Sequence, residues 1–150
     1  MNLTLITTDS SSIDFRNLVT ELDKDLSVRD GEEHGFYSQY NKLDHIKHVV
    51  VAYFENKAVG CGAFKEYEPG AVEIKRMFVL PEYRGQGIAL QVLSKLEQWA
   101  SSLNYNASIL ETGKKQPEAI ALYQKAGYGI IPNYGQYVGI ENSVCMRKTI

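Results

Sequence analysis

The fold is decided by residues 72–89, which read VEIKRMFVLPEYRGQGIA from Val72 to Ala89. The first part predicts a strand that ends at Pro81, and the rest predicts a turn that passes through Gly85 and Gly87 into a helix. Glycines let the backbone approach a ligand closely and leave consecutive N–H groups uncovered, and the helix start adds unpaired N–H groups and the positive end of its dipole. With the cation of Arg84, this turn predicts a phosphate site, although an ordinary glycine-rich turn has the same residues.

Outward from this stretch, the sequence predicts an alternation of strands and helices. Before it we expect a strand at 3–6, a helix capped within 9–12, a loop with a short helix at 29–47, and strands at 48–54, 58–66 and 71–80. After it we expect a helix at 86–103, a strand at 108–110, a helix opened by Pro117 and closed by Gly127, and strands at 128–131 and 143–148. The apolar stripes are Phe15, Val19, Leu22 and Leu26 in the first helix, and Ile88, Val92, Leu96, Trp99 and Leu103 in the long one. This α/β mixture is a largely antiparallel meander that feeds a strand–helix–strand–helix unit.

Composition restricts the class of protein. The 150 residues leave room for one domain, and a net charge of −2 gives no basic excess that would indicate a nucleic-acid partner. The charge is unevenly spread, because residues 1–75 carry a net charge of −5 and residues 76–150 one of +3. The two cysteines predict neither a disulfide framework nor a structural zinc site. No segment resembles a signal peptide or a membrane span, so a cytoplasmic location with no membrane partner is expected.

Two motifs together resemble the GNAT superfamily of acyl-CoA-dependent N-acyltransferases. Residues 84–89, RGQGIA, match that family's Arg/Gln-x-x-Gly-x-Gly/Ala signature, and residues 116–128, QPEAIALYQKAGY, match its second signature, a helix with Leu-Tyr that ends in Gly-aromatic. The resemblance covers residues 48–148 and looks like that of a small bacterial subgroup. It implies the GNAT fold: a mixed, mostly antiparallel central sheet of about six to seven strands flanked by about four helices. Residues 1–150 then form a single N-acetyltransferase domain.

The resemblance also implies acetyl-CoA as the acyl-donor cosubstrate and no metal. By position in the family motif, the diphosphate contacts the turn and the helix start, while the pantetheine arm pairs with the preceding strand. The implied cofactor-binding residues are Phe78, Val79, Arg84, Gly85, Gln86, Gly87, Ile88, Ala89 and Gln116. A backbone N–H near Phe78 or Val79 would polarise the thioester carbonyl. Gln116 departs from the family, in which many members have Asn there, so its contact with the cofactor is left open.

The resemblance implies two catalytic residues. Tyr123 corresponds to the helix tyrosine that protonates the departing thiolate, and the alternative is a core aromatic. Glu73 lies eleven positions before Arg84, the offset of the base glutamate in histone-acetylating members. The alternative for Glu73 is an outward-facing solvated side chain or a partner of Lys75 or Arg76. Whether Glu73 acts directly or through a water molecule stays open.

The sequence leaves the acceptor less defined. The resemblance favours transfer to a primary amine of a small molecule by direct attack in a ternary complex. The alternatives are an N-terminal or lysine acetyltransferase and a non-catalytic acyl-CoA-binding regulatory module. Residues 9–33 carry a net charge of −5, which would attract a cationic amine or simply form a solvated surface. Tyr134 and Tyr137 would shape the acceptor site or pack at the surface, and a homodimer, the acyl-chain preference and the acceptor's identity stay open.

Overall fold

A seven-stranded sheet organises the chain. The structure, a computed structural model, describes residues 2–30 and 46–150. The strands are β1 (Leu3–Thr8), β2 (His48–Phe54), β3 (Lys57–Glu68), β4 (Ala71–Val79), β5 (Ala107–Gly113), β6 (Gly129–Ile131) and β7 (Ser143–Thr149), in the spatial order β1-β2-β3-β4-β5-β7-β6. Every neighbouring pair is antiparallel except β4 and β5. The expected mixed, mostly antiparallel sheet is therefore confirmed.

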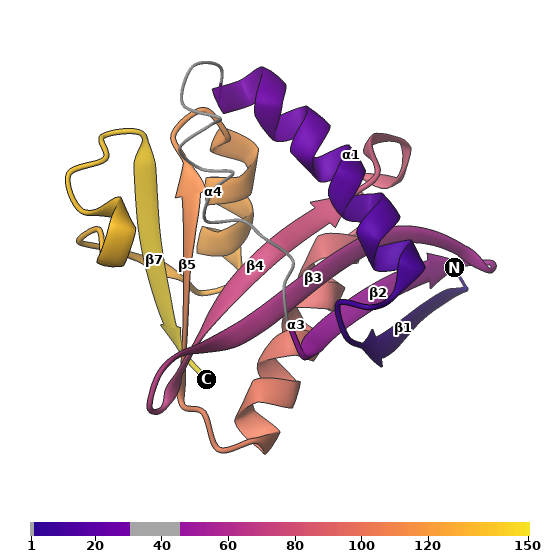
Figure 1. The fold of residues 1–150 in the computed structure, drawn as a ribbon, viewed down its shortest axis with the longest axis horizontal. Helices are drawn as coiled ribbons and strands as arrows, with labels where there is room; N and C mark the ends of the chain where they lie inside the picture. The colour runs from indigo at the N-terminus through magenta and orange to yellow at the C-terminus, as the bar shows by residue number, and fades with distance from the viewer. Residues whose placement is uncertain (1, 31–45) are drawn as a thin grey trace.

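The described helices cover the two faces of this sheet. Helix α1 (Ile13–Asp30) lies in front of it in Figure 1, and α3 (Ile88–Ser102) lies behind it. Phe15, Val19 and Leu22 of α1 pack on Val49 and Val51, while Val92 and Leu96 of α3 pack on Val50 and Ile74. This division follows from strand alternation, because neighbouring residues of β2 point to opposite faces. The third described helix, α4 (Pro117–Lys125), contributes Tyr123 to the core on the α3 side.

Local signals set the ends of these elements. The Ser12 hydroxyl accepts a hydrogen bond from the Phe15 N–H at 3.2 Å, which caps α1, and Pro117 and Gly127 stand at the start and just beyond the end of α4, as expected. The long helix begins at Ile88 rather than at 86, because Gly87 before it is left-handed at φ +80°. Leu103 follows the last helical residue and is 43% exposed, so it does not belong to the apolar stripe. The loop and short helix expected at 29–47 fall largely on residues 31–45, outside the described residues.

The connection between β4 and β5 explains the one parallel pair. After β4 the chain makes a short 3₁₀ turn at Pro81–Tyr83, and α3 then carries it back along the sheet before β5 begins. A parallel neighbour requires such a crossover, usually a helix. The glycine turn therefore stands at the carboxyl end of β4, where the crossover starts. A second 3₁₀ turn, Gly135–Tyr137, lies between β6 and β7.

Candidate active site

Strands β4 and β5 separate beside the glycine turn. They pair only from Ala71 to Glu73 on β4 and from Ala107 to Ile109 on β5. Beyond these residues β4 continues along β3, and β5 continues along β7. The two strands point in the same direction and diverge, which opens the sheet toward the carboxyl end of β4 (Figure 1).

A β-bulge lies in the diverging part of β4. Arg76 has φ +59°, and the pairing with β3 shifts between Ala63 opposite Lys75 and Cys61 opposite Phe78. Because a bulge adds one residue to the strand, the alternation of side chains changes phase there. Phe78 consequently joins the core on the α1 side, whereas Val79 joins the core on the α3 side.

A cavity of about 540 Å³ extends from the glycine turn along the end of β4. Of the nine residues expected to bind the cofactor, eight line this cavity: Phe78, Val79, Arg84, Gly85, Gly87, Ile88, Ala89 and Gln116. Gln86 lies between the two glycines and is exposed. Gln116 precedes Pro117 and makes no side-chain cap on α4, so its side chain has no structural bond to the helix start. The expected cofactor residues thus meet in one place, although they come from a strand, a turn and two helices.

The turn itself presents bare backbone. Gly85 and Gly87 have φ +81° and +80°, and a Cβ atom built on either would have nothing within 4 Å. Residues with a side chain rarely adopt this left-handed conformation, and among the described residues no other atom lies close to where a side chain at either glycine would begin. The amides of the turn and of the first residues of α3 are therefore accessible to an anion.

Arg84 lies in the wall of this cavity, where three contacts position its side chain. Its Nε donates to the Val79 carbonyl at 2.8 Å, its guanidinium lies 5.4 Å from the Phe78 ring centre, and its Nη2 lies 4.0 Å from Asp25 Oδ2 on α1. These contacts fix a cation beside the glycine turn. An acidic residue of the first half of the chain thus faces a basic residue of the second half.

The Val79 amide faces the gap between the strands. The Leu80 N–H donates to the Val59 carbonyl on β3 at 2.9 Å. Successive N–H groups of a strand point to opposite edges, so the Val79 N–H points away from β3. Of the two amides considered from the sequence, the one at Val79 is directed toward the opening.

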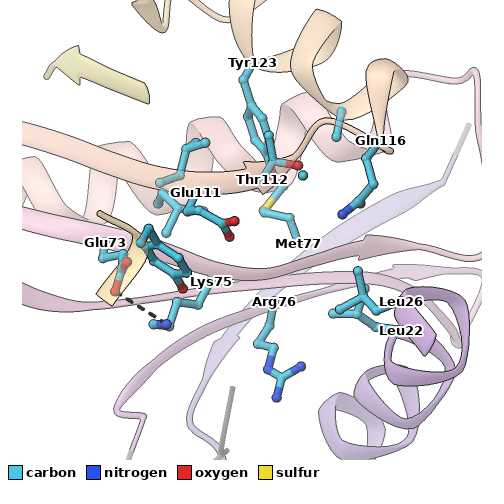
Figure 2. A pocket seen from close by; sticks show the side chains of 15 residues that line it. Leu22, Leu26, Glu73, Lys75, Arg76, Met77, Glu111, Thr112, Gln116 and Tyr123 are labelled. Carbon is cyan, nitrogen blue, oxygen red and sulfur yellow. Dashed lines mark ion pairs between the residues drawn. The ribbon is translucent and has the colours of Figure 1, made fainter. Parts of the chain in front are cut away.

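A second cavity, of about 120 Å³, adjoins the first. Both are lined by Leu22, Met77, Gln116, Ala119 and Tyr123, so the two cavities lie side by side. The second cavity adds charged side chains, namely Glu73, Lys75, Arg76 and Glu111. In Figure 2, Lys75 and Arg76 leave β4 on the side of Leu22 and Leu26, while Met77 lies on the side of Tyr123.

Tyr123 stands where the two cavities meet. It extends from α4 toward Met77 (Figure 2), is 8% exposed and packs edge-to-face on Tyr128. Its hydroxyl has no hydrogen-bond partner in residues 2–30 and 46–150. Burial raises the pKa of this hydroxyl, and the nearby Glu111 raises it further. Tyr123 is therefore a protonated donor with its hydroxyl available to a ligand.

Glu73 is buried rather than solvated. It is 5% exposed, its Oε2 accepts a hydrogen bond from the Tyr134 hydroxyl at 2.7 Å, and its Oε1 lies 3.5 Å from Lys75 Nζ. The alternative of an outward-facing glutamate is thus wrong, and the pairing with Lys75 is present. Two carboxylate oxygens offer about four acceptor positions, so these contacts leave capacity for a further donor.

The structure adds to the site Glu111, which sequence reasoning missed, and places two tyrosines that it had considered. Glu111 on β5 lines the second cavity opposite Glu73 and points into it in Figure 2. The available signal was a charged residue directly after the strand expected at 108–110. Tyr137 lines this cavity, and Tyr134 reaches it through Glu73. Both tyrosines therefore belong to the site rather than to an unrelated surface.

The part of the chain that the structure describes contains no helix long and apolar enough to cross a membrane. Within that same part, no three His, Cys, Asp or Glu side chains gather where they could share a metal ion.

Comparison with known sequences identifies the family. The pattern of the Acetyltransferase (GNAT) family matches residues 15–128. An IAA acetyltransferase from Azospirillum brasilense is 38% identical over 102 residues, which cover 67% of this chain and 67% of that protein. An uncharacterized N-acetyltransferase from Escherichia coli, YjgM, is 30% identical over 109 residues, 71% of this chain and 64% of that protein. The chain thus spans about two thirds of the length of these relatives.

Comparison with solved structures agrees on the fold. A protein from Klebsiella pneumoniae described as an acyl-CoA N-acyltransferase has a TM-score of 0.83 and 27% identity, with 99% of this chain and 97% of that one covered. A GNAT family acetyltransferase from Elizabethkingia anophelis, solved with acetyl-CoA bound, has a TM-score of 0.72 and 20% identity over 99% of both chains.

Proposed function

The chain belongs to the GNAT family of acetyltransferases, and we propose that it transfers an acetyl group from acetyl-CoA to a primary amine of a small molecule. The transfer takes place by direct attack in a ternary complex, within one N-acetyltransferase domain that comprises residues 1–150. The observation that carries this proposal is the pair of adjoining cavities that share Tyr123 in their walls. Direct attack requires donor and acceptor side by side, and two adjoining cavities can hold them so.

The larger cavity suits the donor. The bare amides around Gly85 and Gly87, the start of α3 and Arg84 fit a diphosphate, and the apolar walls at Phe78 and Val79 fit a pantetheine arm. The Elizabethkingia anophelis neighbour, which has the same fold, binds acetyl-CoA. Bound here, acetyl-CoA supplies an activated thioester at the gap between β4 and β5.

The residues around that gap can carry an aminolysis. The Val79 N–H polarises the thioester carbonyl while the amine nitrogen attacks its carbon, so that a C–N bond forms and the C–S bond breaks. Glu73 accepts a proton from the ammonium form of the acceptor, directly or through a water molecule. Tyr123 donates its hydroxyl proton to the departing thiolate and recovers one as the nitrogen loses its second proton. The net products are an amide, coenzyme A and one released proton.

The proposal is tested by thiol release from acetyl-CoA across a panel of small primary amines and peptides. Tyr123→Phe keeps the ring that packs on Tyr128 but removes the hydroxyl, so we expect kcat to fall by a factor of about 10²–10⁴ with little change in the KM for acetyl-CoA. The matched control is Tyr105→Phe, which removes a hydroxyl bonded to exposed Glu66 and should leave both constants unchanged. An unchanged kcat in Tyr123→Phe would remove Tyr123 from the acid role.

The same assay separates the alternatives. Release with peptides only would replace the small-molecule acceptor by a protein, and coenzyme A binding without release to any acceptor would identify a non-catalytic module. Glu73→Gln and Glu111→Gln, compared at saturating acetyl-CoA, identify the base. The larger loss of kcat is expected for Glu73→Gln.

A further inference from the structure

Two consecutive cations lie on the same face of β4. Neighbouring residues of a regular strand point to opposite faces, and the bulge removes this alternation at Arg76, whose φ is +59°. Lys75 and Arg76 therefore both enter the smaller cavity on the side of α1 (Figure 2). Their side chains are 9% and 5% exposed, so two positive charges are buried side by side.

The described part of the chain pairs these cations only in part. Arg76 Nη1 donates to Asp23 Oδ1 at 2.8 Å, a single contact from a guanidinium with five N–H donors. Lys75 Nζ lies 3.5 Å from Glu73 Oε1, longer than the 2.7–2.9 Å typical of a hydrogen-bonded ion pair. Residues 2–30 and 46–150 give neither cation another partner.

Buried donors that have no acceptor within the described residues indicate a ligand. Polar groups in protein interiors are nearly always hydrogen-bonded, and an uncompensated buried charge is costly. The missing acceptor must be anionic and small, because it has to fit between Lys75 and Arg76 in a cavity of about 120 Å³. A carboxylate matches best, since the planar guanidinium fork binds carboxylates with two parallel hydrogen bonds.

We infer that the acceptor is an amino acid or a related amine with a carboxylate, which Lys75 and Arg76 bind while its amine faces Glu73 and Glu111. This inference rests on the proposed function and names its substrate class. The four charged side chains of the cavity, two cations and two carboxylates, are complementary to such a zwitterion. A polycationic amine would instead place positive charge against Lys75 and Arg76.

The first test uses the unmodified enzyme. Thiol release is measured with each of the twenty amino acids, with their carboxamides, with the amines left by their decarboxylation, and with polyamines. We expect the kcat/KM of the best amino acid to exceed that of its carboxamide and of its decarboxylated amine by at least tenfold. Equal or better turnover of the carboxamide would overturn the inference while leaving the proposed function intact, whereas no release with any amine or peptide would count against both.

The second test separates binding from structure at Arg76. Arg76→Gln should raise the KM for the amino acid at least tenfold, leave the KM for acetyl-CoA unchanged and affect the carboxamide less than the amino acid, and Arg76→Lys should recover part of the loss. Asp23→Asn removes the ion pair but keeps the guanidinium, so the KM for the amino acid should stay the same or fall. Lys24→Gln, on the exposed face of α1, is the neutral control. If Asp23→Asn raised the KM for the amino acid as much as Arg76→Gln, Arg76 would only hold α1 in position, and the inference would be wrong.

Discussion

The glycine turn permits a prediction in which backbone strain and ligand binding are measured separately. Gly85 and Gly87 line the larger cavity at φ +81° and +80°, and Gly139 has φ +81° but lies outside both cavities. In all three, a Cβ would have nothing within 4 Å. Alanine at each position therefore introduces the same strain and no overlap, which makes Gly139→Ala a matched control for Gly85→Ala and Gly87→Ala.

The stability effect should be common to the three variants. An L-residue in the left-handed region costs about 1–2 kcal/mol. For a protein of this size, each kcal/mol lowers Tm by roughly 2–4 °C. All three variants should thus melt a few degrees below the unmodified protein and unfold cooperatively.

The affinity for coenzyme A should differ among the three variants. Hydrogen bonds to charged groups contribute about 1.5–3 kcal/mol each. A methyl group over the turn that displaces one N–H from a phosphate would weaken coenzyme A binding by roughly 10- to 150-fold, since 1.4 kcal/mol is a factor of ten. We expect this loss in Gly85→Ala and Gly87→Ala, and the same affinity as the unmodified protein in Gly139→Ala.

Titration calorimetry with coenzyme A and thermal melts of the same samples give both quantities. Equal weakening in all three variants would mean that strain alone lowers affinity. Full affinity in Gly85→Ala and Gly87→Ala would show that the turn does not contact the phosphates, and the reasoning from its bare amides would be refuted.

Three further predictions concern the surroundings of the site. Asp25→Asn removes a carboxylate that lies 4.0 Å from Arg84 and would repel the diphosphate. Calorimetry should therefore show that coenzyme A binds about 1.5- to 5-fold more tightly, and weaker binding would contradict this. Gly62→Ala places a Cβ against the Met77 sulfur and 2.8 Å from Leu96 Cδ1; this overpacking should cost about 1–3 kcal/mol, and an unchanged urea midpoint would disprove it. Burial raises the pKa of the Cys61 thiol to about 12, so mass spectrometry should find it unalkylated by iodoacetamide at pH 9 until the protein unfolds. Because the unfolded thiol, with a pKa near 9, ionises first, the stability that Cys61 contributes should fall as pH rises from about 9 toward 12.

Elements defined by local patterns could be predicted closely. The expected strand at 48–54 has the bounds of β2, and the helix opened by Pro117 is α4. Capping, alternation and glycine at positive φ act over a few residues, so the sequence carries them directly. The glycine turn belongs to this class, which is why residues 78–89 could be expected to gather around one site.

The acceptor side depends on contacts that no local pattern encodes. The bulge at Arg76 arises from the register between β4 and β3, and it decides which side chains of β4 share a face. Glu73 is held by Tyr134, 61 residues away, and Arg76 by Asp23, 53 residues away. Each of these pairs forms only after the sheet and α1 are assembled, so the spacing of Glu73 from Arg84 could suggest a base but not its partners.

The uneven charge of the chain acquires a different meaning once these contacts are known. The acidic residues 9–33 suggested attraction of a cationic acceptor or a solvated surface, yet Asp23 faces Arg76 and Asp25 faces Arg84. Part of the negative charge of the first half therefore offsets cations of β4 and of the glycine turn. The net charge of a segment sets long-range attraction, whereas selection of a bound group depends on which donors remain unpaired at the cavity wall. By that criterion the smaller cavity needs an anion beside Lys75 and Arg76 and an amine beside Glu73, and a carboxylate-bearing amine meets both requirements.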